Sequence, residues 1–406
     1  MMKTTTTATI TTTVFLFLLC FCAAPCKTEH CAGGNHSVKI KSLFQFGDSF
    51  ADTGNALHLY PNSWVGKPPN GITIGKPTGR FSDGLVIFDY IAKALGLDSP
   101  TPYLDITGKS TRSNGANFAV GGVTALSGDT LMKRWNISLP FANSTLDVQL
   151  QWFRRYLLRT CRRRNNNKSC VSDLLESSLM SIEIGGNDYT LLLLKDEQDI
   201  LAHKKNRTFI SGPIEEAKKS MLPLVIHKIT SALKRMMSDG ATQVFVHGLY
   251  PYGCTPGYLT RFPAVFHNLT VDKLGCIKEA NDFVKYHNHH LRQGLLELQE
   301  QNREVNIIYV DIYKIMRSLL THASSLGFAK TNVTCCGAGG KYNYVYTVFC
   351  GDYRSGVRPC KQPGKYVFWD EFHLSQAASQ QIAKRMIPKI LKKPYPVVCP
   401  RALSYG

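Results

Sequence analysis

The chain lacks several features that would place it in other classes of protein. After the first 24 residues no segment reaches the roughly 20 consecutive apolar residues that a membrane-spanning helix needs, so we expect no membrane span. No Cys-x-x-Cys pair occurs, so neither a zinc ribbon nor a thioredoxin-type redox site is suggested. The interior has no Pro/Ser-rich linker and no repeat, which favours one large domain over the two that 406 residues would also allow.

The N-terminus has the pattern of a secretory signal. Lys3 and a Thr-rich stretch precede an apolar run from Val14 to Ala24, and Cys22 and Ala24 suit the small-residue positions before a cleavage point. We therefore expect a signal peptide over residues 1–24, a single mature domain over residues 25–406, and secretion to the extracellular space, with the vacuole as the alternative. The apolar run is too short to span a bilayer, which disfavours a retained membrane anchor.

The cysteine and asparagine patterns agree with an oxidising compartment. Removing Cys20 and Cys22 with the signal leaves eleven of thirteen cysteines, so one thiol stays unpaired unless cleavage follows Cys26 or two chains are bonded. Local clusters suit loop-closing disulfides, and the pairing within the last cluster stays open: Cys161 with Cys170, Cys254 with Cys276, and Cys335, Cys336, Cys350 and Cys360. Seven sequons mark possible glycan sites: Asn35, Asn136, Asn143, Asn167, Asn206, Asn268 and Asn332.

Acidic residues are few relative to basic ones, 29 against 48, which gives a formal net charge of +19. Such a charge favours polyanions. In a secreted protein an acidic polysaccharide is a better candidate partner than nucleic acid. The densest basic stretch runs from Arg154 to Lys168, and we interpret it as solvated surface rather than a specific site.

Short apolar strands alternate with amphipathic helices along the chain. We expect strands at 43–46, 179–184, 243–247 and 305–311, and helices at 82–95, 215–237, 272–301, 315–326 and 375–391. Ser82 or Asp83 and, for the last helix, Ser375 are the expected N-caps. This alternation is typical of parallel strands joined by crossover helices. The Cys-, Gly- and Tyr-rich segment 332–364 is expected to be an irregular loop.

A serine follows the first expected strand. In the segment Phe46-Gly47-Asp48-Ser49 the hydroxyl of Ser49 can lie near backbone N–H groups at the start of a helix, where developing negative charge is stabilised. Taken alone, a turn capped by Ser49 or Asp48 explains the same residues better.

An aspartate and a histidine lie three residues apart near the other end of the chain. In a turn, this spacing brings the carboxylate of Asp370 close to the imidazole of His373, where it can fix the ring tautomer while the other nitrogen takes a proton. A solvent-facing salt bridge would have the same sequence. Whether the neighbouring Glu371 faces the same place stays open.

Two glycine-containing segments could supply hydrogen-bond donors. Gly121 and Gly122 follow an apolar run, and the absence of a side chain lets a backbone N–H approach a substrate oxygen closely. Asn187 follows another expected strand and could present its side-chain amide to the same oxygen. Each segment alone is also explained as a tight turn.

Taken together and in this order, the four segments resemble the GDSL esterase/lipase family within the SGNH hydrolases. The likeness runs from about Leu43 to about Met386. Four further segments resemble the plant branch of the family: Gly79-Arg80-Phe81-Ser82-Asp83-Gly84, Tyr250-Pro251-Tyr252-Gly253-Cys254, Tyr286-His287-Asn288 and Cys335-Cys336-Gly337. The resemblance implies a flavodoxin-like three-layer α/β/α sandwich with a central parallel sheet. It also implies no metal and no organic cofactor.

The resemblance assigns a role to each candidate residue. It implies that Ser49 is the nucleophile, His373 the general base and later acid, and Asp370 the residue that orients His373. Gly122 and Asn187 would form the oxyanion hole with the N–H of Ser49, and Gly121 is the fallback for Gly122. The expected activity is hydrolysis of a small-molecule or polysaccharide ester, or of an acyl lipid, through an acyl-enzyme on Ser49. The alternatives are an acyltransferase that uses the same residues and a non-catalytic binding protein.

Competing sites are weaker. The Gly-x-Ser-x-Gly elbow of the α/β-hydrolases is absent. His287 and His290 share a helix face with no nearby Cys or carboxylate to complete a metal site, so a solvated helix face is the favoured interpretation. Asp48 and Asp52 are expected to accept hydrogen bonds from neighbouring backbone N–H groups rather than bind a cation.

Overall fold

The computed structural model describes residues 39–106, 114–139, 144–163, 169–202, 209–346, 348–352 and 356–391. The expected signal peptide over residues 1–24 lies outside these residues, as do four of the sequons, Asn35, Asn143, Asn167 and Asn206. Of the other sequons, Asn136 and Asn268 are exposed and Asn332 is half-buried.

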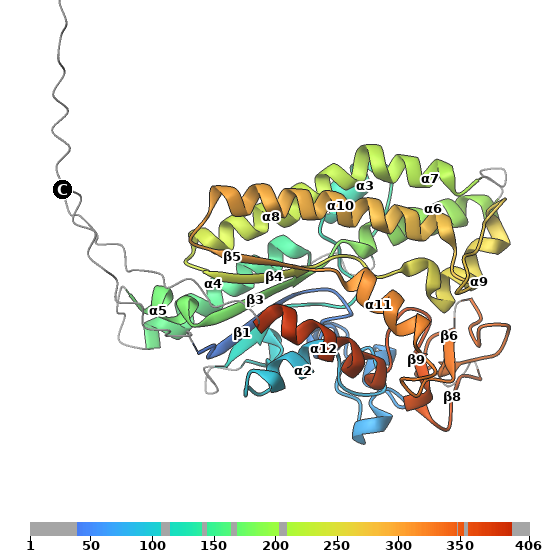
Figure 1. The fold of residues 1–406 in the computed structure, drawn as a ribbon, viewed down its shortest axis with the longest axis horizontal. Coiled ribbons are helices and arrows are strands. Elements are labelled where there is room, and N and C mark those ends of the chain that lie inside the picture. Colours follow the sequence, from blue (N-terminus) through green and yellow to red (C-terminus); the bar gives the residue numbers. More distant parts are fainter. Residues whose placement is uncertain are drawn as a thin grey trace, which may run out of the picture. The chain divides into compact units, whose positions relative to one another are not determined.

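Within the described residues, five strands form one parallel sheet (Figure 1). They are β1 (Ser42–Gly47), β2 (Gly115–Asn117), β3 (Ser178–Glu183), β4 (Gln243–His247) and β5 (Asn306–Val310). Their order across the sheet is β2-β1-β3-β4-β5, and every neighbouring pair is parallel. This is the flavodoxin-like order, in which the chain reverses its direction of winding beside β1. The expected α/β fold with a central parallel sheet is confirmed.

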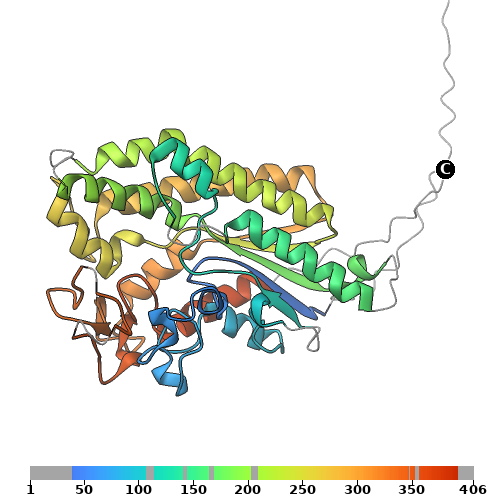
Figure 2. The same cartoon turned by 180° about the vertical axis from the view of Figure 1, so that it is seen from behind.

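Helices cover both faces of this sheet (Figures 1 and 2). Helices α2 (Ile87–Ala94) and α12 (Gln376–Leu391) lie on one face, and α4 (Leu146–Arg163), α8 (Leu222–Ser238) and α10 (Lys278–Gln301) on the other. Phe153 of α4 packs edge-on against Phe44 of β1 with ring centroids 5.2 Å apart. Phe88 of α2 stacks on Phe245 of β4 at 6.1 Å. Burial of these side chains on the two faces stabilises the three layers.

The remaining elements connect the layers and build the loops above the sheet. The helices are α1 (Asn55–Leu59), α3 (Gly128–Trp135), α5 (Cys170–Glu176), α6 (Gly186–Leu201), α7 (Ser211–Glu216), α9 (Pro256–Val265) and α11 (Ile312–Thr321). Two small sheets pair β6 (Lys330–Thr334) with β9 (Tyr366–Phe368) and β7 (Cys336–Gly337) with β8 (Arg358–Pro359). The cysteine-rich segment therefore contains short strands as well as irregular loop. No helix of the described part of the chain is both long and apolar enough to cross a bilayer.

Four disulfides join the clustered cysteines. The pairs are Cys161–Cys170, Cys254–Cys276, Cys335–Cys360 and Cys336–Cys350. The last two resolve the pairing that the sequence leaves open: the adjacent Cys335 and Cys336 bond to different partners in the following loop.

Two expected helices begin later than predicted, and the helix expected at 315–326 is observed as α11 at Ile312–Thr321. Helix α2 begins at Ile87 rather than near Ser82, because Ser82 donates a hydrogen bond to the backbone of Leu374 and Asp83 accepts one from Gln376 N. Helix α10 begins at Lys278, since Asp272 holds a turn by accepting N–H bonds from residues 274 and 276. The N-cap expected at Ser375 is confirmed: its hydroxyl accepts a bond from Ala378 N at 3.1 Å.

Candidate active site

The carboxyl ends of three neighbouring strands open onto one cavity. Ser49 follows β1, the Gly121–Gly122 pair follows β2, and Asn187 follows β3. All of them line a cavity of about 390 Å³ together with His373, which comes from the loop between β9 and α12. In open α/β sheets a ligand binds outside the carboxyl ends of the strands where the strand order reverses, and the cavity occupies that place.

A continuous chain of hydrogen bonds joins the serine to the aspartate. The Ser49 Oγ lies 2.7 Å from His373 Nε2, although the two residues are 324 positions apart in the sequence. On the other side of the ring, His373 Nδ1 lies 2.8 Å from both carboxylate oxygens of Asp370. Asp370 Oδ1 also accepts the backbone N–H groups of Phe372 and His373, which fixes the turn. This geometry lets the imidazole accept the serine proton while the carboxylate holds the ring.

The charges around His373 stabilise the protonated form of its ring. Burial alone lowers the pKa of His373, but the carboxylate of Asp370, with smaller contributions from Glu371 and Asp48, outweighs burial and raises the pKa above its usual 6.5. The ring is therefore a stronger base than an isolated histidine.

The loop that carries Ser49 is held by aspartates. Asp52 accepts N–H bonds from Gly54, Asn55 and Ala56 within the loop, and from Gly121 at 2.8 Å in the loop after β2. Asp48 Oδ1 accepts the N–H of residue 50. The expectation that Asp48 and Asp52 bond backbone N–H groups is confirmed. Asp52 thereby ties the loop after β1 to the loop after β2.

This arrangement distinguishes the two glycines. The N–H of Gly121 is taken by Asp52, and a Cβ there would lie 2.2 Å from the ring of Phe81. Among the described residues no acceptor bonds the N–H of Gly122, whose positive φ of 79° is accessible to glycine without strain. Of the pair, Gly122 therefore has the available N–H at the cavity.

Asn187 comes from the first turn of α6. Its Nδ2 donates to Val123 O at 2.8 Å and, over a longer distance of 3.2 Å, to Asp48 Oδ2. The two bonds fix the plane of the amide at the cavity wall. The longer one is the weaker of the two and leaves a hydrogen that a substrate oxygen can share.

A buried pair of carboxyl groups lies beneath the serine. Asp48 and Glu183 hydrogen-bond to each other through their side chains, and burial raises the pKa of Glu183 well above its usual value and that of Asp48 to about 6. Two adjacent carboxyls in a dry site share one proton, because both cannot ionise. Glu183 carries that proton and donates it to Asp48, which in turn accepts from Asn187.

Aromatic rings form most of the remaining wall. Phe50 and Phe81 lie on His373 with centroids 5.3 and 4.9 Å from the imidazole. Farther out, Trp64 stacks in parallel on Phe349 at 5.6 Å. A cavity with such walls excludes water and strengthens the electrostatic interactions inside it.

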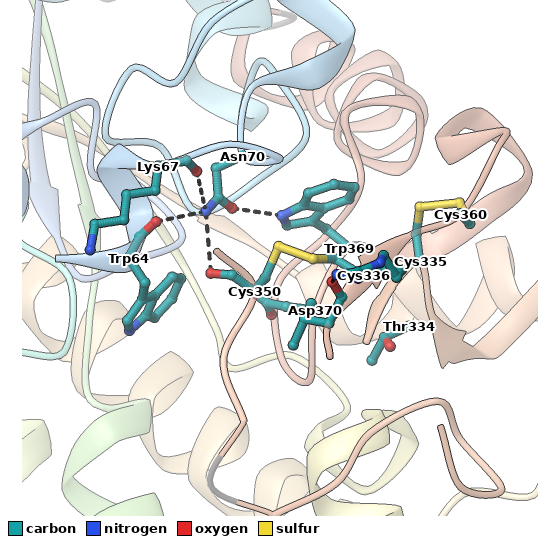
Figure 3. The surroundings of a disulfide bond; sticks show 12 residues. Trp64, Lys67, Asn70, Thr334, Cys335, Cys336, Cys350, Cys360, Trp369 and Asp370 are labelled. Carbon is teal, nitrogen blue, oxygen red and sulfur yellow. Dashed lines mark hydrogen bonds between the residues drawn. A yellow bond between two sulfur atoms is a disulfide. The ribbon is translucent and has the colours of Figure 1, made fainter. Parts of the chain in front are cut away.

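One buried asparagine joins the cavity wall to the Asp370 loop (Figure 3). Asn70 Nδ2 donates to the carbonyls of Trp64, Lys67 and Cys350, and its Oδ1 accepts from Trp369 Nε1 at 2.8 Å. Strand β7, which contains Cys336 of the Cys336–Cys350 disulfide, lies alongside, and Cys336 N donates to the carbonyl of Trp369 at 2.7 Å. Sequence reasoning missed Asn70, and its only sequence signal is its place in the turn Pro68-Pro69-Asn70-Gly71.

The histidine-rich helix face differs from expectation. His287 is fully buried and bonds Tyr189 at 2.9 Å, so its assignment to a solvated helix face is wrong, while His290 is half-buried. Burial lowers the pKa of His287 to about 3, and the ring is therefore a neutral core residue. In the described residues no group of three or more His, Cys, Asp or Glu side chains is placed to hold a metal ion.

Comparison with known proteins gives a consistent result. Residues 43–386 match the family described as GDSL-like Lipase/Acylhydrolase. Acetylajmalan esterase 2 of Rauvolfia serpentina is 36% identical over 87% of this chain and 91% of that protein. The protein named GDSL esterase/lipase At1g28640 of Arabidopsis thaliana is 36% identical over 85% of this chain and 84% of its own length. Sinapine esterase of Brassica napus is 34% identical, with coverages of 88% and 86%.

Proposed function

The chain belongs to the GDSL-like lipase/acylhydrolase family and is a carboxylic ester hydrolase, and from that premise we propose that Ser49 is its nucleophile, His373 its general base, and Asp370 the residue that orients His373. The observation that carries this proposal is the 2.7 Å contact between Ser49 Oγ and His373 Nε2 in a cavity closed by aromatic rings. A serine hydroxyl is a weak nucleophile until an adjacent base accepts its proton.

The proposed reaction has two steps. Ser49 Oγ forms a bond to the ester carbonyl carbon as His373 Nε2 takes its proton, and the proton then passes to the alcohol oxygen as the ester bond breaks. Water attacks the acyl-enzyme in the second step and gives its proton to the same nitrogen, which returns it to Ser49 as the acid leaves. The carboxylate of Asp370 stabilises the imidazolium.

The tetrahedral intermediates carry a negative oxygen that needs donors. We assign the backbone N–H of Ser49, the N–H of Gly122 and the side-chain amide of Asn187 to this oxyanion hole. Engagement of the neighbouring N–H of Gly121 by Asp52 supports the choice of Gly122. The carboxyl pair of Asp48 and Glu183 supports the amide of Asn187 from below.

A serine-reactive phosphonate tests the nucleophile directly. Wild-type protein is expected to be labelled at Ser49 and to lose its ester hydrolysis in proportion. Ser49→Ala is expected to lose both labelling and turnover while keeping its thermal midpoint, and Ser63→Ala, which removes another serine of the cavity wall, is expected to keep the label. Turnover by Ser49→Ala equal to wild type would refute the assignment.

The same acyl-enzyme could pass its acyl group to an alcohol other than water. The choice of acceptor depends on the shape of the cavity and on how well water is excluded. Product analysis with and without added alcohols separates the two activities, since a transferase accumulates the new ester and a hydrolase the free acid. We expect hydrolysis to predominate.

The substrate and the compartment are proposed together. A panel of acetyl, fatty acyl and hydroxycinnamoyl esters, tested beside acetylated polysaccharide, would define the acyl preference.

Secretion is supported by the N-terminal segment 1–24, the disulfides and the exposed sequons at Asn136 and Asn268. The net charge of +19 supports contact with an acidic polysaccharide, which retention of the full-length protein on pectate at low but not high salt would test.

A further inference from the structure

Glu371 is a carboxyl group at the cavity that the proposed reaction does not use. It lies two residues before His373 and contributes to the wall of the same cavity. Only 5% of its surface is exposed. A carboxyl taken this far out of water needs a partner, and its place in the wall means that a bound ligand can supply one.

The carboxyl accepts a hydrogen bond from the backbone N–H of its own residue. Within the described residues, no other residue forms a hydrogen bond or an ion pair with the Glu371 carboxyl. Arg261 of α9 acts on the carboxyl electrostatically, but its guanidinium is bonded to Glu197 through Nε at 3.0 Å and Nη2 at 2.8 Å. Burial, and next the charge of Asp370, therefore raise the pKa of Glu371 to about 8.

The described wall of the cavity is poor in positive charge. Among the described residues, no lysine or arginine lines it, although the sequence contains 48 of them. Two carboxyl groups, those of Asp48 and Glu371, do line it. The faces of aromatic rings are also electron-rich and attract cations, and Tyr60, Trp64 and Phe349 are among the rings of the wall. A positively charged group is the ligand chemistry that these features have in common.

We propose that Glu371 is a specificity-determining residue that binds a positively charged amine or quaternary ammonium group of the ester substrate. The inference rests on the proposed function and narrows it, because the ester must carry that charge within reach of a carboxyl next to the catalytic loop. A neutral ester of the same shape leaves Glu371 without a cationic partner, whereas a cationic one pairs with it and offsets part of the cost of its burial.

A pair of esters that differ only in charge tests this directly. A choline ester and the 3,3-dimethylbutyl ester of the same acid have the same shape, with nitrogen in one and carbon in the other. We expect wild-type kcat/KM to favour the choline ester by about tenfold or more. Glu371→Gln is expected to lower this ratio severalfold, because only the rings and Asp48 then remain to attract the cation, and Glu371→Asp to restore part of it. A matched control, Glu300→Gln on the exposed face of α10, removes one negative charge elsewhere and is expected to keep the wild-type ratio.

The pH dependence of the ratio is a second readout that a purely structural role would not produce. The charged and titratable groups that act on Glu371 are Asp370 and His373 of its own loop, Arg261 of α9 and Tyr344. Titration of His373 changes the rates of both esters together and cancels from the ratio. We therefore expect the wild-type ratio to rise with a midpoint near pH 8 and to level off above it, and the Glu371→Gln ratio to stay flat.

Two results would separate this inference from the proposal on which it rests. Hydrolysis of both esters that depends on Ser49, with a wild-type ratio near one or a ratio unchanged by Glu371→Gln, would overturn the cation site and leave the esterase intact. Loss of Ser49 dependence would overturn the proposed function itself.

Discussion

Trp369 Nε1 donates a hydrogen bond to Asn70 Oδ1 at 2.8 Å, across 299 positions of sequence. Trp369 immediately precedes Asp370, and the carbonyls that Asn70 holds belong to the cavity wall and to the disulfide loop. One fully buried amide therefore connects the Asp370 loop to the cavity wall (Figure 3). The contact makes Asn70 a positioning residue that can be tested apart from the site itself.

Trp369→Phe removes the donor and keeps an aromatic ring in place. The variant leaves Asn70 Oδ1 buried without a partner, which costs about 1–3 kcal/mol of folding free energy. We expect a lower thermal midpoint and, at temperatures where the protein stays folded, a lower kcat with little change in KM. Asn70→Ala orphans three carbonyls as well and is expected to be worse on both counts. If Trp369→Phe loses stability but keeps its kcat, the bond between Trp369 and Asn70 contributes to folding only and does not position the site.

Removal of the Cys336–Cys350 disulfide is expected to affect both stability and turnover. Its loop spans 14 residues, for which chain entropy gives about 3 kcal/mol. Cys350 also holds Asn70 through its carbonyl, and the adjacent Phe349 lines the cavity. The double variant Cys336→Ser/Cys350→Ser should therefore lose stability in denaturant titration and also show a raised KM.

The Cys161–Cys170 disulfide provides the matched control. It joins α4 to α5 and neither cysteine lines the cavity. Its double serine variant should lose a comparable free energy of unfolding and keep its kinetic constants below the melting range. Equal kinetic losses in the two double variants would show that the Cys336 disulfide acts only through global stability.

Asp370→Asn keeps a side-chain oxygen that can accept the backbone N–H groups of the turn, but it removes the charge that acts on His373. We expect kcat to fall by on the order of 10³–10⁴-fold while the fold is retained, as judged by circular dichroism.

Activity needs the neutral imidazole, so it is lost as the pH falls through the pKa of His373. In the wild type the acidic limb of kcat/KM should have its midpoint above 6.5. In the variant burial is no longer opposed by Asp370, and the midpoint should move to lower pH.

Asn187→Ala removes one donor from the proposed oxyanion hole. A fall in kcat of about 10²–10³-fold with little change in KM is expected, because the donor acts mainly on the charge that develops in the transition state. Thr190→Val, one turn farther along α6 and also in the cavity wall, is the control and should change kcat far less. A variant whose only defect is a raised KM would place the amide in substrate binding instead.

Some parts of the fold could be predicted because their signals are local. The strand at Gln243–His247 is an apolar run between a turn and a glycine, and Ser375 begins its helix as a cap. The start of α10 could not be predicted in this way. The side chain of Asp272 accepts hydrogen bonds from two N–H groups, and a disulfide fixes Cys276 before the helix begins. Burial of His287 likewise depends on Tyr189, which is 98 residues away.

The candidate site, like the fold, has parts that local sequence signals predict and parts that depend on long-range contacts. The order of the four motifs located the serine, the glycine pair, the asparagine and the Asp-x-x-His turn. The choice between the two glycines depended on Asp52, whose bond to Gly121 crosses 69 residues. Asn70 acts only through groups that folding brings to it from two distant segments of the chain. Contacts of this kind leave no periodicity or spacing in the sequence.

The wide separation of Ser49 and His373 along the chain has a consequence for synthesis. The ribosome adds Ser49 long before His373, so a growing chain holds the serine hydroxyl without its proposed base. Reactivity toward esters would appear only when the β9–α12 connection docks beside β1. A chain that terminates before His373 should therefore be inactive toward cellular esters, and the order of translation itself delays the chemistry until folding is complete.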